Sequence, residues 1–301
     1  MILLKICITY EDCEILKISY FCAMINKKTM RYIMIYRLDN FVESNINPIT
    51  KSPYDNSWII YIVDSGPYKM MCGSNNDCAY TLRISKTNHP EWKMYVGDFI
   101  SYNEKYNRNA ILVISEDDLG LVQKEYMGHS YNDPFLRDYE SPVLIHSTTK
   151  ENLENIMKCQ MLKSWNRLKT EGFFTESSPI GKQLGDPEEL RDFILFGGGT
   201  TGEIVVNSKQ NNKLIYDENI EYRTGARLYF DMRKLADDGL ILRDGSEIKI
   251  KDCLPLNPYL IWISTWDKIG LEDEISTPKI FAEKSDEFFK TNINKEFNYT
   301  Y

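Results

Sequence analysis

The stretch Pro142-Val-Leu-Ile-His146-Ser147-Thr148 gives the first clear indication of the fold, because a short apolar run ends in three polar residues. The apolar residues predict a buried strand, and Thr148-Thr-Lys-Glu151 has the pattern of a capping box that starts a helix directly afterwards. Polar groups at the end of a buried strand are often presented to a cleft by a rigid scaffold. Because His129 also lies close by, we expect the functional site within residues 128–169.

Strand-like runs dominate the rest of the chain. They are short, rich in Ile, Val and Tyr, and bounded by Asn, Asp, Gly or Pro. The predicted strands are residues 58–63, 80–84, 110–115, 143–146, 203–206, 213–216, 227–231, 240–242, 247–250 and 259–264. One predicted helix begins at Ser115, a second follows the capping box at 148–151, and a third begins at Asp186-Pro187. Another helix is expected near 281–290. Strands with scattered helices and without regular alternation indicate an α+β fold rather than a doubly wound parallel sheet.

The length of 301 residues favours two domains. A soft boundary is expected near residue 140, where Asn132-Asp-Pro134 and Ser141-Pro142 bracket an acidic stretch. The expected organisation is an N-terminal α+β region over 1–140, a second domain over 141–270, and a C-terminal helix with a frayed end over 271–301.

Composition narrows the classes of function. The net charge of −8 argues against nonspecific binding to a nucleic-acid backbone, which needs a basic surface. The seven cysteines form no C-x-x-C pair, which favours reduced thiols in a cytoplasmic protein. No apolar run of about 18 residues occurs, so we expect no contact with a membrane. Three histidines argue against a histidine-rich metal site, whereas a carboxylate site stays open, and we predict no metal.

Two candidate groups follow from residue type. His146 is either a catalytic group at a strand end or a partly buried histidine bonded to backbone, with Thr148 as a helix cap. Arg167, between Lys163 and Lys169, suits a phosphate or pyrophosphate ligand, and a solvated basic loop is the alternative.

The run Gly197-Gly-Gly-Thr-Thr-Gly202 is glycine-rich, but no Gly-Lys-Ser/Thr follows it and a strand is expected next. It therefore fails as a phosphate loop, and a flap or hairpin turn is predicted instead. Glu203 follows directly. It is either a carboxylate that orients a sugar hydroxyl or stabilises cationic charge, or a glutamate on the protein surface. Arg223 and Arg227 are ligand clamps or exposed turn residues.

Taken in order, Gly128-His129-Ser130 and His146-Ser147-Thr148 resemble the Gly-His-Ser and His-Gly-Thr motifs of the tRNA 2′-phosphotransferase family. This family belongs to the ADP-ribosyltransferase superfamily. The segment Gly225-Ala-Arg-Leu-Tyr-Phe-Asp-Met, followed by Asp238-Gly239 and Leu254-Pro255, is similar to the closing strands of the family. The resemblance covers roughly residues 120–265.

The chain departs from the family pattern at several points. Ser147 replaces the glycine of His-Gly-Thr, and Lys124 stands where the family has an arginine. The basic-histidine motif of the N-terminal lobe has a faint counterpart in Asn88-His89-Pro90. A long insertion containing the glycine-rich run and Glu203 separates Arg167 from the Arg227 strand. The superfamily fold and the use of NAD+ are therefore better supported than the 2′-phosphate substrate.

The resemblance implies split antiparallel sheets that bind NAD+ as a co-substrate, in the 141–270 domain. His146, Arg167, Arg227 and Glu203 would be catalytic, with the arginines as phosphate clamps; His129, Ser147, Thr148 and Lys124 would bind the cofactor. The implied reaction breaks the nicotinamide–ribose bond and transfers ADP-ribose to a macromolecule, with a nucleic acid favoured and a protein as the alternative. Superfamily toxins or defence factors that modify DNA or protein are close competitors. A catalytically silent module that binds NAD+ or ADP-ribose is the alternative from another class.

Overall fold

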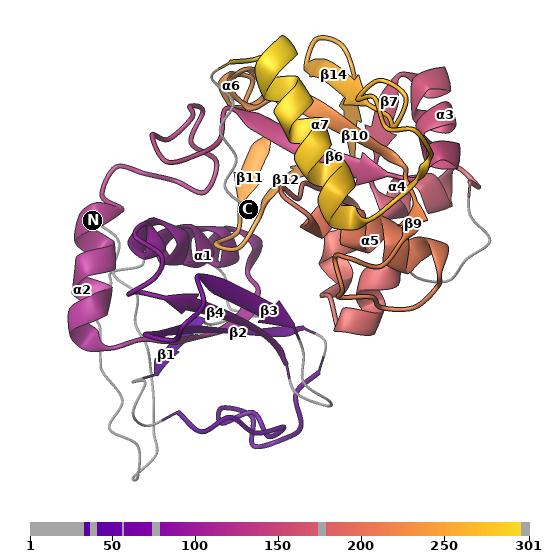
Figure 1. The fold of residues 1–301 in the computed structure, drawn as a ribbon. Coiled ribbons are helices and arrows are strands. Elements are labelled where there is room, and N and C mark those ends of the chain that lie inside the picture. The colour runs from indigo at the N-terminus through magenta and orange to yellow at the C-terminus, as the bar shows by residue number, and fades with distance from the viewer. Residues whose placement is uncertain (1–32, 37–40, 56, 74–78, 174–178, 296–301) are drawn as a thin grey trace. The chain divides into compact units, whose positions relative to one another are not determined.

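The computed structural model describes residues 33–36, 41–55, 57–73, 79–173 and 179–295, and the chain has a mixed α+β fold with several small sheets (Figure 1). The chain divides into two compact units. The N-terminal unit consists of Met1–Tyr131 with the short segments Gly185–Pro187 and Arg243–Ser246, and the C-terminal unit contains the remainder. The first division therefore falls at Tyr131, somewhat before residue 140. Across the described ranges, no helix is both long and apolar enough to cross a membrane.

The N-terminal unit is built on a five-stranded sheet in the order β1-β5-β2-β4-β3. Its elements are β1 (Ile33–Tyr36), β2 (Trp58–Asp64), β3 (Met70–Gly73), β4 (Tyr80–Ser85), α1 (Trp92–Tyr106), β5 (Asn109–Val113) and α2 (Glu116–Glu125). Four strands are parallel, and β3 pairs antiparallel with β4 at one edge. The predicted strands at 58–63, 80–84 and 110–115 are confirmed, whereas the strand pattern does not anticipate α1 or the parallel pairing.

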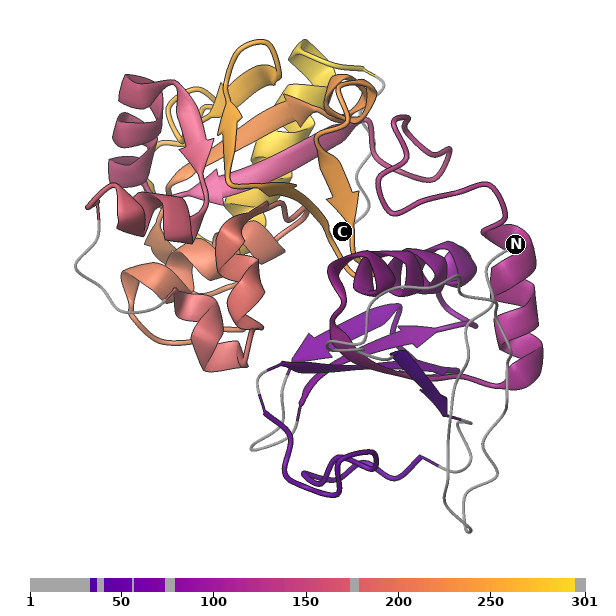
Figure 2. The ribbon, with the colours of Figure 1, turned by 180° about the vertical axis from the view of Figure 1, so that it is seen from behind.

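Strand β2 lies in the middle of this sheet, and its five residues from Ile59 to Val63 are all buried. A continuous buried run is typical of a parallel strand that is covered on both faces. Tyr61 packs with Phe99 of α1 and Leu119 of α2 on one face, whereas the other face packs against the segment containing Phe41 and Tyr54. Both views show α1 over the first of these faces (Figure 1, Figure 2).

The segment Arg243–Ser246 completes the N-terminal unit from a distant part of the chain. The carbonyl oxygen of Gly245 accepts a hydrogen bond from the Tyr61 hydroxyl at 2.7 Å. Gly245 has φ +90°, and a Cβ there would lie 2.7 Å from the Tyr95 carbonyl oxygen, so glycine is required at this position. The Arg243 amide donates to the Tyr131 carbonyl at 2.9 Å.

The C-terminal unit contains small sheets, and one with three strands pairs β6 and β14 antiparallel on either side of β10. Its elements begin with β6 (Val143–Thr148), α3 (Lys150–Cys159), β7 (Met161–Lys163), α4 (Trp165–Thr170), the 3-10 helices η2 (Ile180–Leu184) and η3 (Glu188–Asp192), β8 (Phe193–Leu195) and α5 (Thr201–Gln210). They continue with β9 (Tyr222–Arg223), β10 (Ala226–Asp231), α6 (Met232–Asp237), β11 (Ile241–Arg243), β12 (Ile248–Lys251), β13 (Cys253–Pro255), β14 (Leu260–Ser264), β15 (Ile275–Ser276) and α7 (Pro278–Asn292). Strand β8 pairs with β12, β7 with β13 and β9 with β15.

The sheet of β6, β10 and β14 is buried on both faces. Leu144 and Leu228 belong to the main core of the unit on one face. Val143, Ile145 and Tyr229 pack against Phe289 of α7 on the other, where the rings of Tyr229 and Phe289 stack with centroids 4.2 Å apart. Helix α7 therefore covers the second face (Figure 1).

Several predicted elements of this unit are confirmed: β6, β10, β11, β12 and β14 match the predicted strands, and α7 contains the helix expected near 281–290. The predicted capping box is wrong in register by one residue. Thr148 is the last residue of β6, and Thr149 is the N-cap, with its hydroxyl accepting from the Asn152 amide at 3.3 Å.

Three other predictions in this region are wrong. Residues 203–206 are helical within α5, because Glu203, Val206 and Asn207 have the spacing of one helix face and that face is buried. Packing here overrides the strand preference of Ile204 and Val205. Residues 213–216 form no regular element. The helix expected after Asp186 is reduced to the 3-10 turn η3, since the following Phe193–Leu195 pairs with β12.

Candidate functional site

Strand β6 presents its last polar residues to opposite faces of the sheet. In the antiparallel pair with β10, Ser147 lies opposite Arg227 and His146 lies opposite Leu228. Neighbouring residues in a strand point to opposite faces. Ser147 therefore shares a face with Arg227, whereas His146 and Thr148 belong to the other face. The predicted site residues of this strand form two groups rather than one.

His146 is partly buried and is bonded to backbone. Its Nδ1 lies 3.0 Å from the carbonyl oxygen of Leu195 in β8, and the ring of Phe196 meets it edge-on at 6.1 Å. A carbonyl can only accept, so we assign the proton to Nδ1, which makes Nε2 the acceptor of the neutral ring. Burial lowers the pKa of His146, although the bond to Leu195 opposes this shift. His146 is thus a neutral imidazole with an acceptor nitrogen that suits a hydroxyl donor.

Arg227 is fully buried at the centre of a polar network on the opposite face. Its Nη1 donates to the Gly199 carbonyl at 2.9 Å and to Oε1 of Glu203 at 3.3 Å. Its Nη2 donates to both carboxylate oxygens of Asp286, at 2.9 and 3.1 Å, and its Nε donates to the Tyr229 hydroxyl at 3.3 Å. These bonds engage all three nitrogens of the guanidinium. In this conformation the guanidinium of Arg227 bonds to the protein itself. Arg227 is therefore a buried residue of β10 and not an exposed turn residue.

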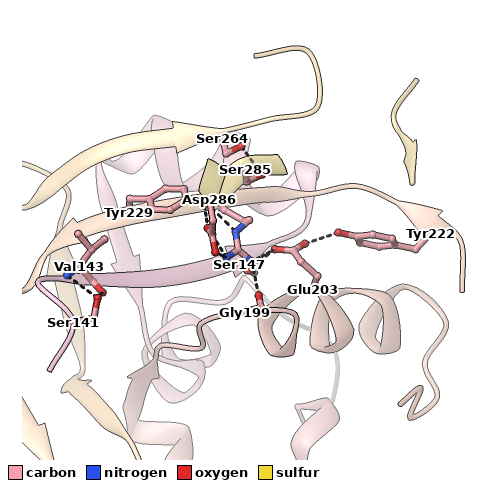
Figure 3. Close-up of polar contacts among 11 residues, drawn as sticks. Ser141, Val143, Ser147, Gly199, Glu203, Tyr222, Tyr229, Ser264, Ser285 and Asp286 are labelled. Carbon is pink, nitrogen blue, oxygen red and sulfur yellow. Dashed lines mark hydrogen bonds and ion pairs between the residues drawn. The ribbon is translucent and has the colours of Figure 1, made fainter. Parts of the chain in front are cut away.

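Glu203 is the second member of this network, and it is fully buried rather than a surface glutamate. Oε1 also accepts from the Ser147 hydroxyl at 2.6 Å, and Oε2 accepts from the Tyr222 hydroxyl at 2.5 Å. Burial raises the pKa of Tyr222 far above its ordinary value, and the neighbouring Glu203 carboxylate adds to the shift. Tyr222 is therefore a permanent donor, and Glu203 is held by three donors from β6, β9 and β10 (Figure 3).

Asp286 of α7 is the third member, and it pairs with two groups of β10. Besides the two bonds from Arg227, its Oδ1 accepts from the Tyr229 hydroxyl at 2.6 Å. Burial alone would lower the pKa of Arg227, but the adjacent Tyr229, Asp286 and Glu203 raise it well above its ordinary value. The guanidinium is therefore charged at all accessible pH values, and loss of one buried partner would leave an uncompensated charge.

The glycine-rich run connects this network to β6. The Gly197 amide donates to the Ile145 carbonyl at 3.0 Å, and Gly199, with φ +56°, offers its carbonyl to Arg227. A Cβ on Gly202 would lie 2.4 Å from Oγ of Ser147, so only glycine leaves room for the bond from Ser147 to Glu203. The predicted hairpin turn is wrong, because helix α5 follows the run.

Arg167 makes its ion pairs with residues outside both groups. It belongs to the short helix α4, where its side chain is 47% exposed. Its Nε bonds to Glu171 at 2.5 Å, and its Nη1 lies 3.5 Å from Asp252. The arginine is thus on a helix rather than in a loop, and it takes part in surface ion pairs.

The other residues predicted to bind the cofactor, and Arg223, lie in different parts of the fold. Lys124 is exposed in the last turn of α2, and His129 follows that helix, so both belong to the N-terminal unit. Thr148 is buried at the end of β6, opposite Ala226, and a Cβ on Gly225 would lie 1.9 Å from the Thr148 carbonyl oxygen. Arg223 is half-exposed in β9 and pairs with Glu274.

Sequence reasoning identifies Ser147, Glu203 and Arg227 but not the partnership with Asp286 and Tyr229. A signal for Asp286 does exist. Phe281, Ala282, Ser285 and Phe289 mark one buried face of α7, and Asp286 is a carboxylate within that apolar spacing. A carboxylate on a buried face requires a cation, and Arg227, which is buried within a strand, needs an anion.

Comparisons with protein families, with curated proteins and with solved structures find no match for this chain. Among the side chains that the structure describes, no group of three or more His, Cys, Asp or Glu is arranged to hold a metal ion.

Proposed function

We propose that the protein is an NAD+-dependent transferase of the ADP-ribosyltransferase type, which breaks the bond between nicotinamide and ribose and transfers ADP-ribose to a macromolecular acceptor. The observation that carries this proposal is the state of His146 at the end of β6. A neutral imidazole whose Nδ1–H is fixed on the Leu195 carbonyl keeps Nε2 as an acceptor, and a ribose hydroxyl is a matching donor. The motif resemblance assigns the same role to this residue.

The setting of Glu203 bears on the acceptor. Its two carboxylate oxygens accept hydrogen bonds from Ser147, Tyr222 and Arg227, and the side chain is fully buried. A general base must reach the proton that it removes, and Glu203 faces protein donors instead. A phosphate acceptor is already anionic and needs no base. This favours an RNA 2′-phosphate or a similar nucleic-acid phosphate over a hydroxyl, an amine or a base as acceptor.

The test is nicotinamide release from NAD+ by the purified protein, alone and with 2′-phosphorylated RNA, single-stranded DNA or a protein mixture. Release with 2′-phosphorylated RNA, reduced about 100-fold or more in His146→Ala, is the expected result. Lys279→Ala, at an exposed ion pair with Glu218, is the matched control and should retain wild-type turnover.

Other outcomes have definite meanings. A stable ADP-ribose adduct on DNA or protein would assign the chain to the modifying toxins or defence factors. NAD+ binding without release, weakened in His146→Ala, would assign it to the silent binding modules. Neither binding nor release would refute the proposal. Arg167→Ala tests the remaining predicted clamp: if this residue contacts phosphate, KM for NAD+ should rise despite its surface pairing.

A further inference from the structure

Helix α7 contributes a charged side chain to the interior of the C-terminal unit. Asp286 is 4% exposed, yet it carries a carboxylate, and its partners Arg227 and Tyr229 lie in β10. A carboxylate on a buried helix face is costly to desolvate unless it is paired. An apolar residue there would pack against the sheet without this cost, so the acidic group calls for an explanation beyond packing.

We propose that Asp286 and Tyr229 are positioning residues for the reaction, and this explanation rests on the proposed function. They act through Arg227, which holds the Gly199 carbonyl and Glu203 in place. Glu203 in turn orients Ser147, the residue between His146 and Thr148. The C-terminal helix is therefore part of the site machinery although Asp286 bonds neither His146 nor Thr148.

The hydrogen bonds define the direction of this effect. Both carboxylate oxygens of Asp286 accept from Nη2 of Arg227, and the Tyr229 hydroxyl accepts the Nε–H group while donating to Asp286. These contacts fix the plane of the guanidinium. The two N–H groups of Nη1 then point at the Gly199 carbonyl and at Glu203. Without Asp286 the guanidinium would rotate or admit water, and both contacts of Nη1 would be lost.

Helix α7 has other anchors, which separates positioning from simple attachment. The hydroxyl of Ser264 in β14 donates to the hydroxyl of Ser285 at 2.8 Å, and Phe281 and Phe289 are fully buried. Loss of the Asp286 contact therefore leaves the helix docked. The glycine-rich run depends on the network more strongly, because Gly199 is fixed to Arg227 in a left-handed conformation.

The experiment compares Asp286→Asn and Tyr229→Phe with the control Ser285→Ala, which removes a buried hydroxyl of the same helix outside the network. Tyr229→Phe keeps the stacking on Phe289 and removes only the hydroxyl, so it remains informative if Asp286→Asn fails to fold. The first readout is amide hydrogen exchange of residues 197–203 in the absence of NAD+. The second is kcat and KM with 2′-phosphorylated RNA, measured well below the unfolding temperature of each variant.

Exchange in residues 197–203 should become about tenfold faster in both network variants and stay unchanged in the control. The ratio kcat/KM should fall about tenfold or more, with KM for NAD+ raised. Wild-type exchange rates in both variants would overturn the inference. Faster exchange in residues 197–203 with unchanged kcat and KM would overturn it as well. If the wild-type protein neither binds nor turns over NAD+, the proposed function fails and the positioning role fails with it. Failure of the inference alone is distinct, because the wild-type protein is then active and the variants match it.

Discussion

Replacing Gly202 by alanine should disturb the buried network although it adds only one methyl group. The new Cβ would lie 2.4 Å from Oγ and 2.9 Å from Cβ of Ser147, distances that force the serine side chain to move. The Ser147 hydroxyl then loses its 2.6 Å bond to the Glu203 carboxylate. A hydrogen bond to a charged group contributes about 1.5–3 kcal/mol. Alanine is favoured over glycine in a helix by about 0.5–1 kcal/mol, so we expect a net destabilisation of about 1–2 kcal/mol.

Gly120 provides the matched control, because it lies within helix α2 with nothing within 4 Å of an added Cβ. Gly120→Ala should therefore stabilise its unit by about 0.5–1 kcal/mol. The free energy of unfolding is measured by chemical denaturation, with peptide-resolved hydrogen exchange to separate the two units. Stabilisation of Gly202→Ala to the same extent as Gly120→Ala would refute the close contact.

A double-mutant cycle sharpens this test. In a Ser147→Gly background both obstructing atoms are absent, so Gly202→Ala should cost nothing further and the two substitutions should be non-additive. Additive effects would show that Gly202 and Ser147 do not share the space between α5 and β6.

Two further predictions concern pH. Burial lowers the pKa of His146, so the unfolded chain takes up the proton first as the pH falls. The contribution of this residue to stability should be complete above pH about 6.5 and should fall below that pH, by at most about 1.4 kcal/mol per pH unit. If His146→Gln shows the same dependence of unfolding on pH as the wild-type protein, this reasoning is contradicted. Burial raises the pKa of Asp186 from 3.8 to about 6, so the folded chain holds the proton longer and stability is lost as the pH rises from about 4 to 6. Asp186→Asn should therefore stabilise the protein at pH 7 by up to about 3 kcal/mol and have little effect below pH 4. Chemical denaturation at both pH values measures this. Equal stabilisation at both would exclude the titration of the Asp186 carboxyl as the cause.

The strands of the C-terminal sheet could be predicted because their apolar runs are bounded by turn residues, as at β6 and β10. Helix α5 could not, since Ile204, Val205 and Val206 have strand preference and the helix is stabilised by what its buried face contacts. The parallel sheet of the N-terminal unit is also invisible to local patterns. Its β2 and β4 are joined through the antiparallel β3 rather than through a helix, so the usual alternation is absent.

The candidate site shows the same limit. Spacing identifies Ser147, Glu203 and Arg227 as polar residues near the ends of predicted strands, but it gives no pairing between them. Their association depends on the register of β6 against β10 and on the helical turn that brings Glu203 back toward both strands. Asp286 lies 59 residues after Arg227, and a contact over such a separation is set by the fold alone.

The return of residues 243–246 to the N-terminal unit has a consequence for the order of events during synthesis. A nascent chain that has reached Tyr131 carries β1 to β5, but it lacks the Gly245 carbonyl that accepts from the Tyr61 hydroxyl. That carbonyl is added roughly 110 residues later, on the order of ten seconds at usual rates of translation. Until then a buried phenol in the middle of the sheet has no acceptor from this segment. Of the two units, the one that comes earlier in this chain is thus completed only after most of the other has been made.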